Sequence, residues 1–335
     1  MSNATIRLMA DLPNQNMTRL LADIGGTNAR FAWQAGSGAP LQDVLTLPCA
    51  AHPTVEAAIR AYLDRVDMTP PSHCAIAIAN PVQGDQVQMT NHHWSFSISA
   101  LQKALGLGVL KVLNDFTALA LALPGLPDTD KRQVGGGSPV PGAAIALIGA
   151  GTGLGVSGLL PDGKHDWLPL QGEGGHTSLA PVSDREWQVV KHLQQRHGHA
   201  SAERAVSGQG LVDVFEALCA TDQRAAPSHW TPADITERAL TGQDAYCTEA
   251  LTLFCAFLGS VAGNLALTLG AQGGVYVGGG IVPRLGGWFD RSPFRERFEA
   301  KGRFKSYLSG VPVWVVTAQQ SPALAGAAKA LDTLL

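Results

Sequence analysis

The sequence predicts a mixed α/β protein made of two related halves. At roughly 150 residues per domain, 335 residues suggest about two compact units. Apolar strand-like runs alternate with segments of helical spacing along most of the chain. The segments LLADIGGTNARFAW (20–33) and IALIGAGTGLGVSGLL (145–160) share one design, which is an apolar strand, a Gly-Thr turn and a second strand of small residues. We therefore expect a duplicated α/β unit with a cleft between the copies.

The first half contains clear strand and helix signals. A continuous apolar run such as CAIAIA is typical of a strand buried on both faces, and Ser97 is a good N-cap residue. In order, we expect short strands at 19–22 and 29–33 around the turn Asp23–Thr27, a helix over 55–66, strands at 74–79 and 109–113 separated by a helix over 98–105, and a helix over 116–123.

The second half follows a segment, 124–142, whose Pro and Gly content predicts a linker or surface loop. Ser183-x-x-Glu186 is a capping box pattern and Thr231-Pro232 is a helix start. In order, we expect strands at 143–148 and 155–160, a helix that runs from the capping box to about His197, a helix that begins at Thr231-Pro232, a helix over 247–269 (with Gly259 and Gly263 allowing close packing), strands at 275–277 and 311–316, and a closing helix over 323–335.

Composition excludes several classes of protein. A net charge of −3 does not suit a nucleic-acid binder that relies on phosphate neutralisation. The 45% hydrophobic content excludes wholesale disorder. The stretch 251–269 carries Asn, Gly, Ser and Thr and indicates a buried helix, not a membrane span. Residues 1–16 lack the apolar core of a secretory signal and indicate either a flexible extension or a mis-assigned start before Met17.

The five cysteines are scattered and show no Cys-x-x-Cys spacing. This pattern argues against a zinc site or a disulfide framework and favours a reducing, cytoplasmic setting. Glycine is the compositional outlier, because 38 residues are about 11% of the chain against an average of about 7%. We expect the excess at positions of close approach or unusual dihedral angles.

The glycine-rich turns are the first candidate binding feature. Backbone N–H groups in such turns can converge on an anion, and the Thr hydroxyl adds a donor. A tight hairpin explains one Gly-Gly pair equally well, but two such turns and a third cluster at Gly278–Gly280 favour a polyphosphate ligand.

Two matches to known nucleotide-binding motifs are rejected because the residues around them do not fit. The match to G-x-G-x-x-G at 153–158 continues as a strand, and the match to G-x-x-x-x-G-K at 158–164 lacks the following Ser or Thr.

Two aspartates stand at predicted strand ends. Asp23 precedes the first Gly-Gly turn, where a carboxylate suits magnesium held together with phosphate oxygens, or simply forms the turn. Asp115 is either the N-cap of the following helix or a base bonded to a substrate hydroxyl. In open α/β sheets ligands gather at the carboxyl ends of strands, where both residues are expected.

Further polar candidates lie in the second half. Glu173 and His176 stand in a Gly-rich segment that is too flexible for a helix or strand and can aim both side chains at one ligand, although a surface loop explains it too. Glu203 alone reads as a solvated helix N-terminus. The pairs His92-His93 and His197-x-His199 read as surface residues, not metal ligands.

With these residues in place, the sequence resembles the bacterial glucokinases of the hexokinase–actin-like ATPase superfamily. The resemblance extends from about Thr18 to the C-terminus. The segments that carry it are, in order, ADIGGTNAR (22–30), MTNHHWSFS (89–97), LNDFTALA (113–120), GAGTGLGV (149–156), GEGGH (172–176), SAERAVSGQGL (201–211), DITERAL (234–240) and GGGIVPR (278–284).

The resemblance implies a two-lobed actin-like ATPase (ribonuclease H-like) fold with a deep interlobe cleft. We expect an N-terminal extension at 1–16, a small lobe at 17–125, against which the closing C-terminal helix is a candidate to pack, and a large lobe at 126–335. The implied activity is the phosphorylation of glucose at O6 by ATP with Mg²⁺, a reaction of glycolysis. The resemblance also implies a homodimer located in the cytoplasm.

The resemblance also assigns roles to single residues. Asp115 would be the general base, and Asp23 would hold magnesium directly or through water. The sugar contacts would be Asn114, Asp115, Glu173, His176 and Glu203. The nucleotide contacts would be Ala22, Asp23, Ile24, Gly25, Gly26 and Thr27 in the first phosphate loop, Gly149, Gly151, Thr152 and Gly153 in the second, and Gly278, Gly279 and Gly280 near the adenosine.

Alternative functions stay open at this point. A kinase for another hexose or an amino sugar, a non-catalytic sugar-binding regulator on the same fold, and a polyphosphate-dependent enzyme share most of these features. The related ROK kinases and repressors have similar phosphate loops, but many carry a Cys-rich zinc motif after the Glu-x-x-His segment. This sequence has no cysteine between Cys74 and Cys219. ROK repressors also carry an N-terminal DNA-binding domain, for which sixteen residues before the first strand are too few.

Overall fold

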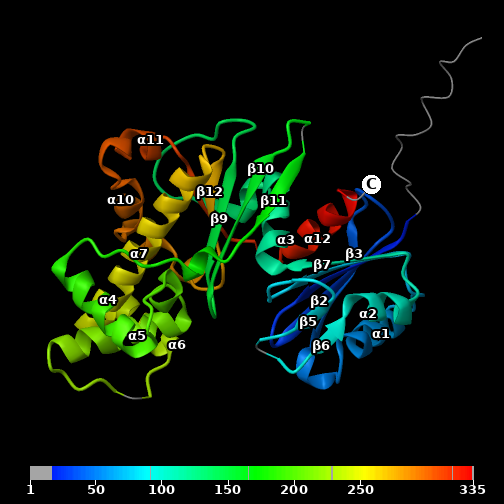
Figure 1. Ribbon diagram of the computed structural model, residues 1–335, viewed down its shortest axis with the longest axis horizontal. Helices are drawn as coiled ribbons and strands as arrows, with labels where there is room; N and C mark the ends of the chain where they lie inside the picture. The colour runs from blue at the N-terminus through cyan, green and yellow to red at the C-terminus, as the bar shows by residue number, and fades with distance from the viewer. Residues whose placement is uncertain (1–16, 91, 165, 228, 319, 334–335) are drawn as a thin grey trace, which may run out of the picture. The chain divides into compact units, whose positions relative to one another are not determined.

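The computed structural model describes residues 17–90, 92–164, 166–227, 229–318 and 320–333. The described chain divides into two compact units, one of residues 17–126 together with 320–333, and one of residues 127–318. The hypotheses on residues 1–16 lie outside the described residues. Each unit contains one mixed sheet with helices packed on it, and both sheets are visible in Figure 1.

The first unit is built on a five-stranded sheet of order β3-β2-β1-β4-β7. Strands β1, β4 and β7 are parallel, and their register brings Ile24, Ile78 and Asn114 level at the carboxyl edge. A two-stranded ribbon accompanies the sheet. The strands are β1 (Arg19–Ile24), β2 (Asn28–Gln34), β3 (Leu41–Pro48), β4 (His73–Ile78), β7 (Val109–Asn114) and the ribbon strands β5 (Gln86–Gln88) and β6 (Ser95–Ser97).

Within the described residues, four α-helices complete the first unit. The closing helix α12 packs against α3 and against strands β1 and β4. Helices α3 and α12 meet at backbone distance, because a Cβ on Gly326 would lie 1.7 Å from the carbonyl oxygen of Ala118. Arg19, only 2% exposed, donates to Asp332 of α12 at 2.7 Å. The helices are α1 (Val55–Arg65), α2 (Ile98–Leu105), α3 (Asp115–Ala122) and α12 (Ala323–Asp332).

The second unit is built on a six-stranded sheet of order β11-β10-β9-β12-β13-β8. Strands β9, β12 and β13 are parallel, and β10 returns antiparallel to β9. The strands are β8 (Lys131–Gln133), β9 (Ile145–Ala150), β10 (Leu154–Pro161), β11 (Trp167–Gln171), β12 (Gly274–Gly278) and β13 (Val313–Val316). The helices are α4 (Asp184–His197), α5 (Gly208–Thr221), α6 (Pro232–Thr241), α7 (Ala245–Leu269), α8 (Val282–Leu285), α9 (Gly287–Arg291), α10 (Phe294–Glu299) and α11 (Lys305–Ser309).

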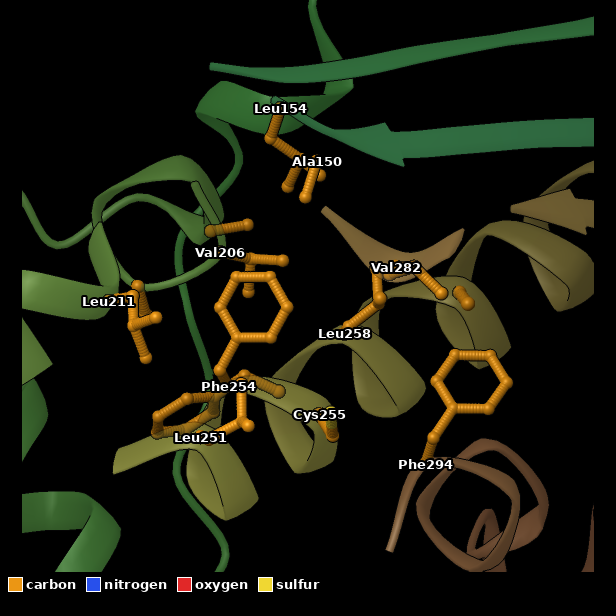
Figure 2. Close-up of a cluster of buried hydrophobic side chains, with 14 of the residues drawn as sticks. Ala150, Leu154, Val206, Leu211, Leu251, Phe254, Cys255, Leu258, Val282 and Phe294 are labelled. Atoms are coloured by element: carbon orange, nitrogen blue, oxygen red, sulfur yellow. The ribbon is translucent and has the colours of Figure 1, made fainter. Parts of the chain in front are cut away.

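Helix α7 is the centre of the second core. Figure 2 shows its Phe254 and Leu258 in one apolar cluster with Ala150 and Leu154, which flank the second Gly-Thr turn. Gly259 lets α10 approach, because a Cβ there would lie 2.2 Å from the carbonyl oxygen of Phe294. The helix is long and apolar enough to cross a membrane, but 67% of its apolar window is buried inside the protein. The expected buried helix is therefore confirmed.

Most predicted elements are present, and four details are corrected. Residues 131–133, expected in a loop, form an edge strand because they pair with β13. Ser183 caps α4, but Glu186 accepts from the backbone of Val182, which leaves the reciprocal half of the capping box unmade. His197 is not a free surface residue, since it bonds the fully buried Asp213 at 2.7 Å. The first strand continues through Asp23, so the turn is shorter than expected.

Candidate active site

The carboxyl edge of the first sheet gathers two acidic residues. Asp23 is the penultimate residue of β1, and Asp115 follows the last residue of β7. Strands β1 and β7 both flank β4, and their ends are level in the register. Although β4 lies between the two strands, the charge of Asp23 acts on the Asp115 carboxylate. Ala22 and Ile24, on either side of Asp23, are fully buried core residues.

Asp115 is the most perturbed acid of this edge. Burial raises the pKa of its carboxyl to about 6, and the charge of Asp23 adds to the rise, whereas the Phe116 amide that Asp115 accepts opposes it. The helix cap is Asn114, whose Oδ1 accepts from the amides of Phe116 and Thr117. The interpretation of Asp115 as the N-cap is therefore wrong, and its carboxylate is not required to begin the helix.

The first Gly-Thr turn is a compact hairpin. The Gly25 amide donates to the carbonyl of Asn28 at 2.9 Å, and the carbonyl of Thr27 accepts from Cys49 at 2.8 Å. Arg30 pairs across the strands with Asp23, and its guanidinium lies 3.4 Å from that carboxylate. Sequence reasoning missed Arg30, although counting across the tight hairpin would have placed it opposite Asp23.

The second Gly-Thr turn and the third glycine cluster lie side by side. Gly149 of β9 pairs with Gly278 of β12, and a Cβ on Gly149 would stand 2.6 Å from the Gly278 carbonyl carbon. Gly279 has a φ of +79°, and a Cβ there would lie 2.3 Å from the carbonyl oxygen of Ala150. These contacts require glycine, and they leave backbone surface where side chains would otherwise stand. Residues 151–153 form the turn, with Thr152 exposed and Gly280 exposed beside it.

Glu203 holds the second turn. It lies in the 3₁₀ turn Ala202–Arg204, and its Oε2 accepts from the amide of Leu154 at 2.9 Å. A Cβ on Gly153 would lie only 2.4 Å from the same oxygen. Glu203 is partly buried, so its interpretation as a solvated helix end is wrong. Within the described residues the other oxygen, Oε1, makes no hydrogen bond.

The segment with Glu173 and His176 packs on the same hairpin. Gly174–His176 form one 3₁₀ turn, so the segment is more regular than the sequence suggested. Gly175 is needed there, because a Cβ would lie 2.1 Å from the carbonyl oxygen of Leu154. The side chains of Glu173 and His176 are exposed. The second unit thus assembles all of its predicted site residues around the β9–β10 hairpin.

One polar link near Asn114 was also missed. The Asn114 amide nitrogen lies 3.4 Å from the carbonyl oxygen of Asn80, which follows β4. The Asn80 side chain accepts from both the amide and the hydroxyl of Thr90. The pattern Asn-Pro directly after a buried strand was the available signal. This link ties the segment before β6 to the carboxyl edge of the sheet.

The fold and the paired Gly-Thr hairpins define a sugar kinase of the actin-like ATPase class. A glucokinase from an Antarctic psychrotroph matches with a TM-score of 0.86 at 37% identity, over 94% of this chain and 99% of that one. The sequence model of the glucokinase family matches residues 20–334. The chain belongs to the glucokinase family.

Two curated relatives agree with this assignment. The glucokinase of Chromobacterium violaceum is 56% identical over 310 residues, which cover 92% of this chain and 88% of the relative. The glucokinase of Neisseria meningitidis is 51% identical over 329 residues, which cover 98% of this chain and 99% of the relative. The resemblance seen in the sequence is therefore confirmed at the level of the family and its fold.

Proposed function

We propose that this glucokinase transfers the γ-phosphoryl group of ATP to O6 of glucose, with Asp115 as the general base. The observation that carries the assignment is a carboxylate at the carboxyl edge of the first sheet, freed from helix capping by Asn114, whose pKa burial raises to about 6. A base is most effective when its pKa lies near the working pH. Asp115 is ionised at neutral pH and still basic enough to take a hydroxyl proton.

The reaction follows from this role. The O6 hydroxyl of glucose attacks the γ-phosphorus of ATP, and the bond from that phosphorus to the β–γ bridging oxygen breaks. The O6 proton passes to a carboxylate oxygen of Asp115, and ADP and glucose 6-phosphate are the products. Phosphoryl transfer of this kind depends mainly on positioning and charge stabilisation, so the remaining residues serve those two ends.

Asp23 fits a magnesium ion. Its side chain is 15% exposed, and among the described residues its carboxylate contacts the guanidinium of Arg30 at a long 3.4 Å. Carboxylate oxygens shared with phosphate oxygens are the usual magnesium environment, and the described residues contain no group of three or more acidic, His or Cys ligands that would compete. When bound there, directly or through water, the ion neutralises phosphate charge. Arg30 adds a second positive charge to the same hairpin.

The glycine clusters hold the nucleotide in this proposal. The amides of Gly25 and Gly151 are bonded within their own turns, to the carbonyls of Asn28 and Gly153. The phosphates are therefore assigned to the remaining amides of residues 26–27 and 152–153 and to the Thr hydroxyl of each turn. Gly278–Gly280 lie against the second turn and leave no side chain over the backbone, which suits a flat adenosine.

The sugar is held by Asn114, Glu173, His176 and Glu203, in addition to Asp115. Asn114 spends its Oδ1 on the helix cap, so its amide nitrogen is the group left to reach a hydroxyl. Glu203 has one oxygen fixed by Leu154, and we assign the other to the sugar. A site that hydrogen-bonds a hydroxyl can reject an analogue lacking it by about 10⁴-fold.

A sugar-dependent ADP-release assay tests the proposal. Glucose should give the highest kcat/KM in a panel with fructose, mannose and N-acetylglucosamine, and ATP with Mg²⁺ should exceed polyphosphate as donor. A higher kcat/KM for N-acetylglucosamine or fructose would make this a kinase for another sugar. Sugar binding without ADP release would make it a regulator. We also propose the homodimer and the cytoplasmic location that the family resemblance implies, and light scattering after gel filtration tests the dimer.

A further inference from the structure

A second concave site lies within the second unit. Its volume is about 320 Å³, and it has one wall formed by a single face of α7 and another formed by the segment that follows the Glu173–His176 loop. Pockets that bind small ligands begin at about this size. The residues that the argument uses are Val156, Gly174, Thr177, Asn264, Leu265 and Lys301.

Lys301 places a positive charge in this pocket. Its stem lies against α7, where Gly263 has no side chain, and its Nζ donates to the carbonyl of Ser260 at 3.0 Å. No carboxylate in the described part of the chain forms an ion pair with it. Burial lowers the pKa of the Lys301 ammonium, and the nearby charge of Arg297 lowers it further. The ammonium therefore lacks an anionic partner.

The neighbouring charges do not supply that partner. Arg297 donates to the buried Glu186 from both terminal nitrogens of its guanidinium, and Nη2 also donates to the Ser260 hydroxyl at 2.8 Å. The carboxylate of Glu186 is thus committed to Arg297 and to the Val182 amide. The base of the pocket keeps one net positive charge, which belongs to Lys301.

The rest of the lining is mixed, since the buried Ser260 lies among apolar residues and the apolar Val182 is exposed. Val156 and Leu265 are partly buried, whereas Thr177 and Asn264 are exposed. A ligand with an apolar body and one carboxylate matches this arrangement, since the carboxylate reaches the ammonium and the body covers the apolar lining. A phosphate dianion would call for a second free cation, and Arg297 is already paired.

The pocket touches the proposed sugar-binding loop. A Cβ on Gly174 would lie 2.8 Å from a methyl carbon of Val156, so the pocket residue Val156 supports the loop directly. The Thr177 hydroxyl donates to the carbonyl of Gly174 at 2.9 Å. A ligand that pushes on Val156 or bonds Thr177 therefore acts on the residues next to Glu173 and His176.

We propose that this pocket is a regulatory site for a small organic carboxylate with an apolar body, and that its occupation changes the affinity for glucose. The effect on glucose rests on the proposed function of Glu173 and His176, whereas carboxylate binding does not. The two can therefore fail separately.

The test uses hexanoate as the probe and hexanamide as its neutral counterpart. Ligand-observed NMR measures binding to the full chain, and steady-state kinetics gives KM for glucose and for ATP with and without hexanoate. Lys301→Met keeps the stem on α7 and removes the charge. Lys305→Met, an exposed lysine outside the pocket, is the matched control. Asn264→Trp fills the pocket from an exposed position of α7 and is a second, independent variant.

We expect saturable hexanoate binding, and binding of hexanamide at least about tenfold weaker, because one charged hydrogen bond is lost. Lys301→Met and Asn264→Trp should each weaken hexanoate binding about tenfold or more, and Lys305→Met should not. Saturating hexanoate should change the glucose KM at least about twofold in the unmodified chain and leave the ATP KM nearly constant.

The proposal would be overturned if hexanoate did not bind saturably, or if Lys301→Met bound it as tightly as the unmodified chain. It would also be overturned if hexanoate binding were lost at high protein concentration, because a second copy of the chain would then cover the pocket. Hexanoate binding with no change in the glucose KM would overturn the regulatory part. Because binding is measured without turnover, a failure of the kinase assignment would leave the carboxylate-binding result standing.

Discussion

The two Gly-Thr hairpins occupy the same place in their sheets but differ in chemistry. In each unit the hairpin joins two antiparallel strands, β1 and β2 or β9 and β10, and the first strand of the hairpin pairs on its other side with a parallel strand, β4 or β12. Asp23 and Gly149 are both penultimate in those first strands. Across the hairpin Asp23 faces Arg30, whereas Gly149 faces Gly155. At this cross-strand position the first hairpin has two charged side chains, and the second hairpin has two glycines.

The neighbouring strand explains the difference. Asp23 pairs with Ala77 of β4, which leaves room for a side chain. Gly149 pairs with Gly278 of β12, and the two backbones are too close for a Cβ. The second unit therefore cannot carry a carboxylate at this position of the strand. Its carboxylate comes instead from Glu203, which bonds the hairpin from outside the sheet. In the proposed function, the first unit therefore supplies the reacting carboxylate and the second unit positions the ligands.

Removal of the base should have the largest effect. Asp115→Asn keeps the shape of the side chain, and the cap provided by Asn114 is untouched, so the fold should be retained. It removes the carboxylate that accepts the O6 proton, and kcat should fall by about 10²–10⁴-fold, because general-base catalysis is worth that much. Stopped-time ADP assays at saturating glucose and ATP measure it. A folded variant within about threefold of the unmodified kcat would exclude Asp115 as the base.

The matched variant on the second unit is Glu203→Ala. Losing one charged acceptor costs roughly 1.5–3 kcal/mol, so glucose affinity should fall by about 10- to 150-fold. The Leu154 amide also loses its partner, so we expect a smaller rise in the ATP KM, with kcat less affected than in Asp115→Asn. Isothermal titration with glucose and kinetics with ATP separate the two effects.

Gly153→Ala isolates the link between Glu203 and the turn. Its Cβ would stand 2.4 Å from Glu203 Oε2 and should push the carboxylate aside without removing it. Gly151→Ala is the control, because a Cβ there meets no atom within 4 Å. Unchanged glucose affinity in Gly153→Ala, together with a large loss in Glu203→Ala, would show that the contact with the turn does not position the sugar ligand.

The pH dependence should report on the first unit alone. With the pKa of Asp115 raised to about 6, kcat/KM for glucose should fall about tenfold per pH unit below that value and level off above it.

The free energy of unfolding should instead decrease as the pH rises. The folded pKa lies above the ordinary 3.8, so folding favours the protonated acid, and stability is lost as pH rises from about 4 to about 6. Asp115→Asn should remove both dependences, and a variant that keeps either would contradict the assignment.

The sequence predicts the two units and most of their helices and strands, but it does not predict features that depend on contacts between residues far apart in the chain. Apolar runs such as 74–79 and caps such as Ser97 act locally, so their strands and helices were predictable. The strand Lys131–Gln133 has no apolar residue, and it exists because β13 offers an edge. Glu203 is 49 residues from Leu154, so nothing in its neighbourhood reveals that it holds the turn. Asn114 and Asp115 are both good caps, and only the backbone angles decide between them.

The smallest and most direct test of the comparison is a pair of glycine substitutions. Gly149→Ala places a Cβ 2.6 Å from the Gly278 backbone, which cannot move aside as a side chain would. Overpacking of this kind costs about 1–3 kcal/mol. Gly25→Ala places its Cβ 3.6 Å from the nearest atom, an ordinary contact, and should change stability by less than about 1 kcal/mol.

Hydrogen exchange followed by mass spectrometry measures the protection of backbone amides in each hairpin separately. Amides of β9 and β12 should lose protection in Gly149→Ala, and those of β1 and β2 should keep it in Gly25→Ala. Equal losses in the two variants would mean that the hairpins are packed alike, and close approach of β12 would then not explain why the second hairpin carries no charge.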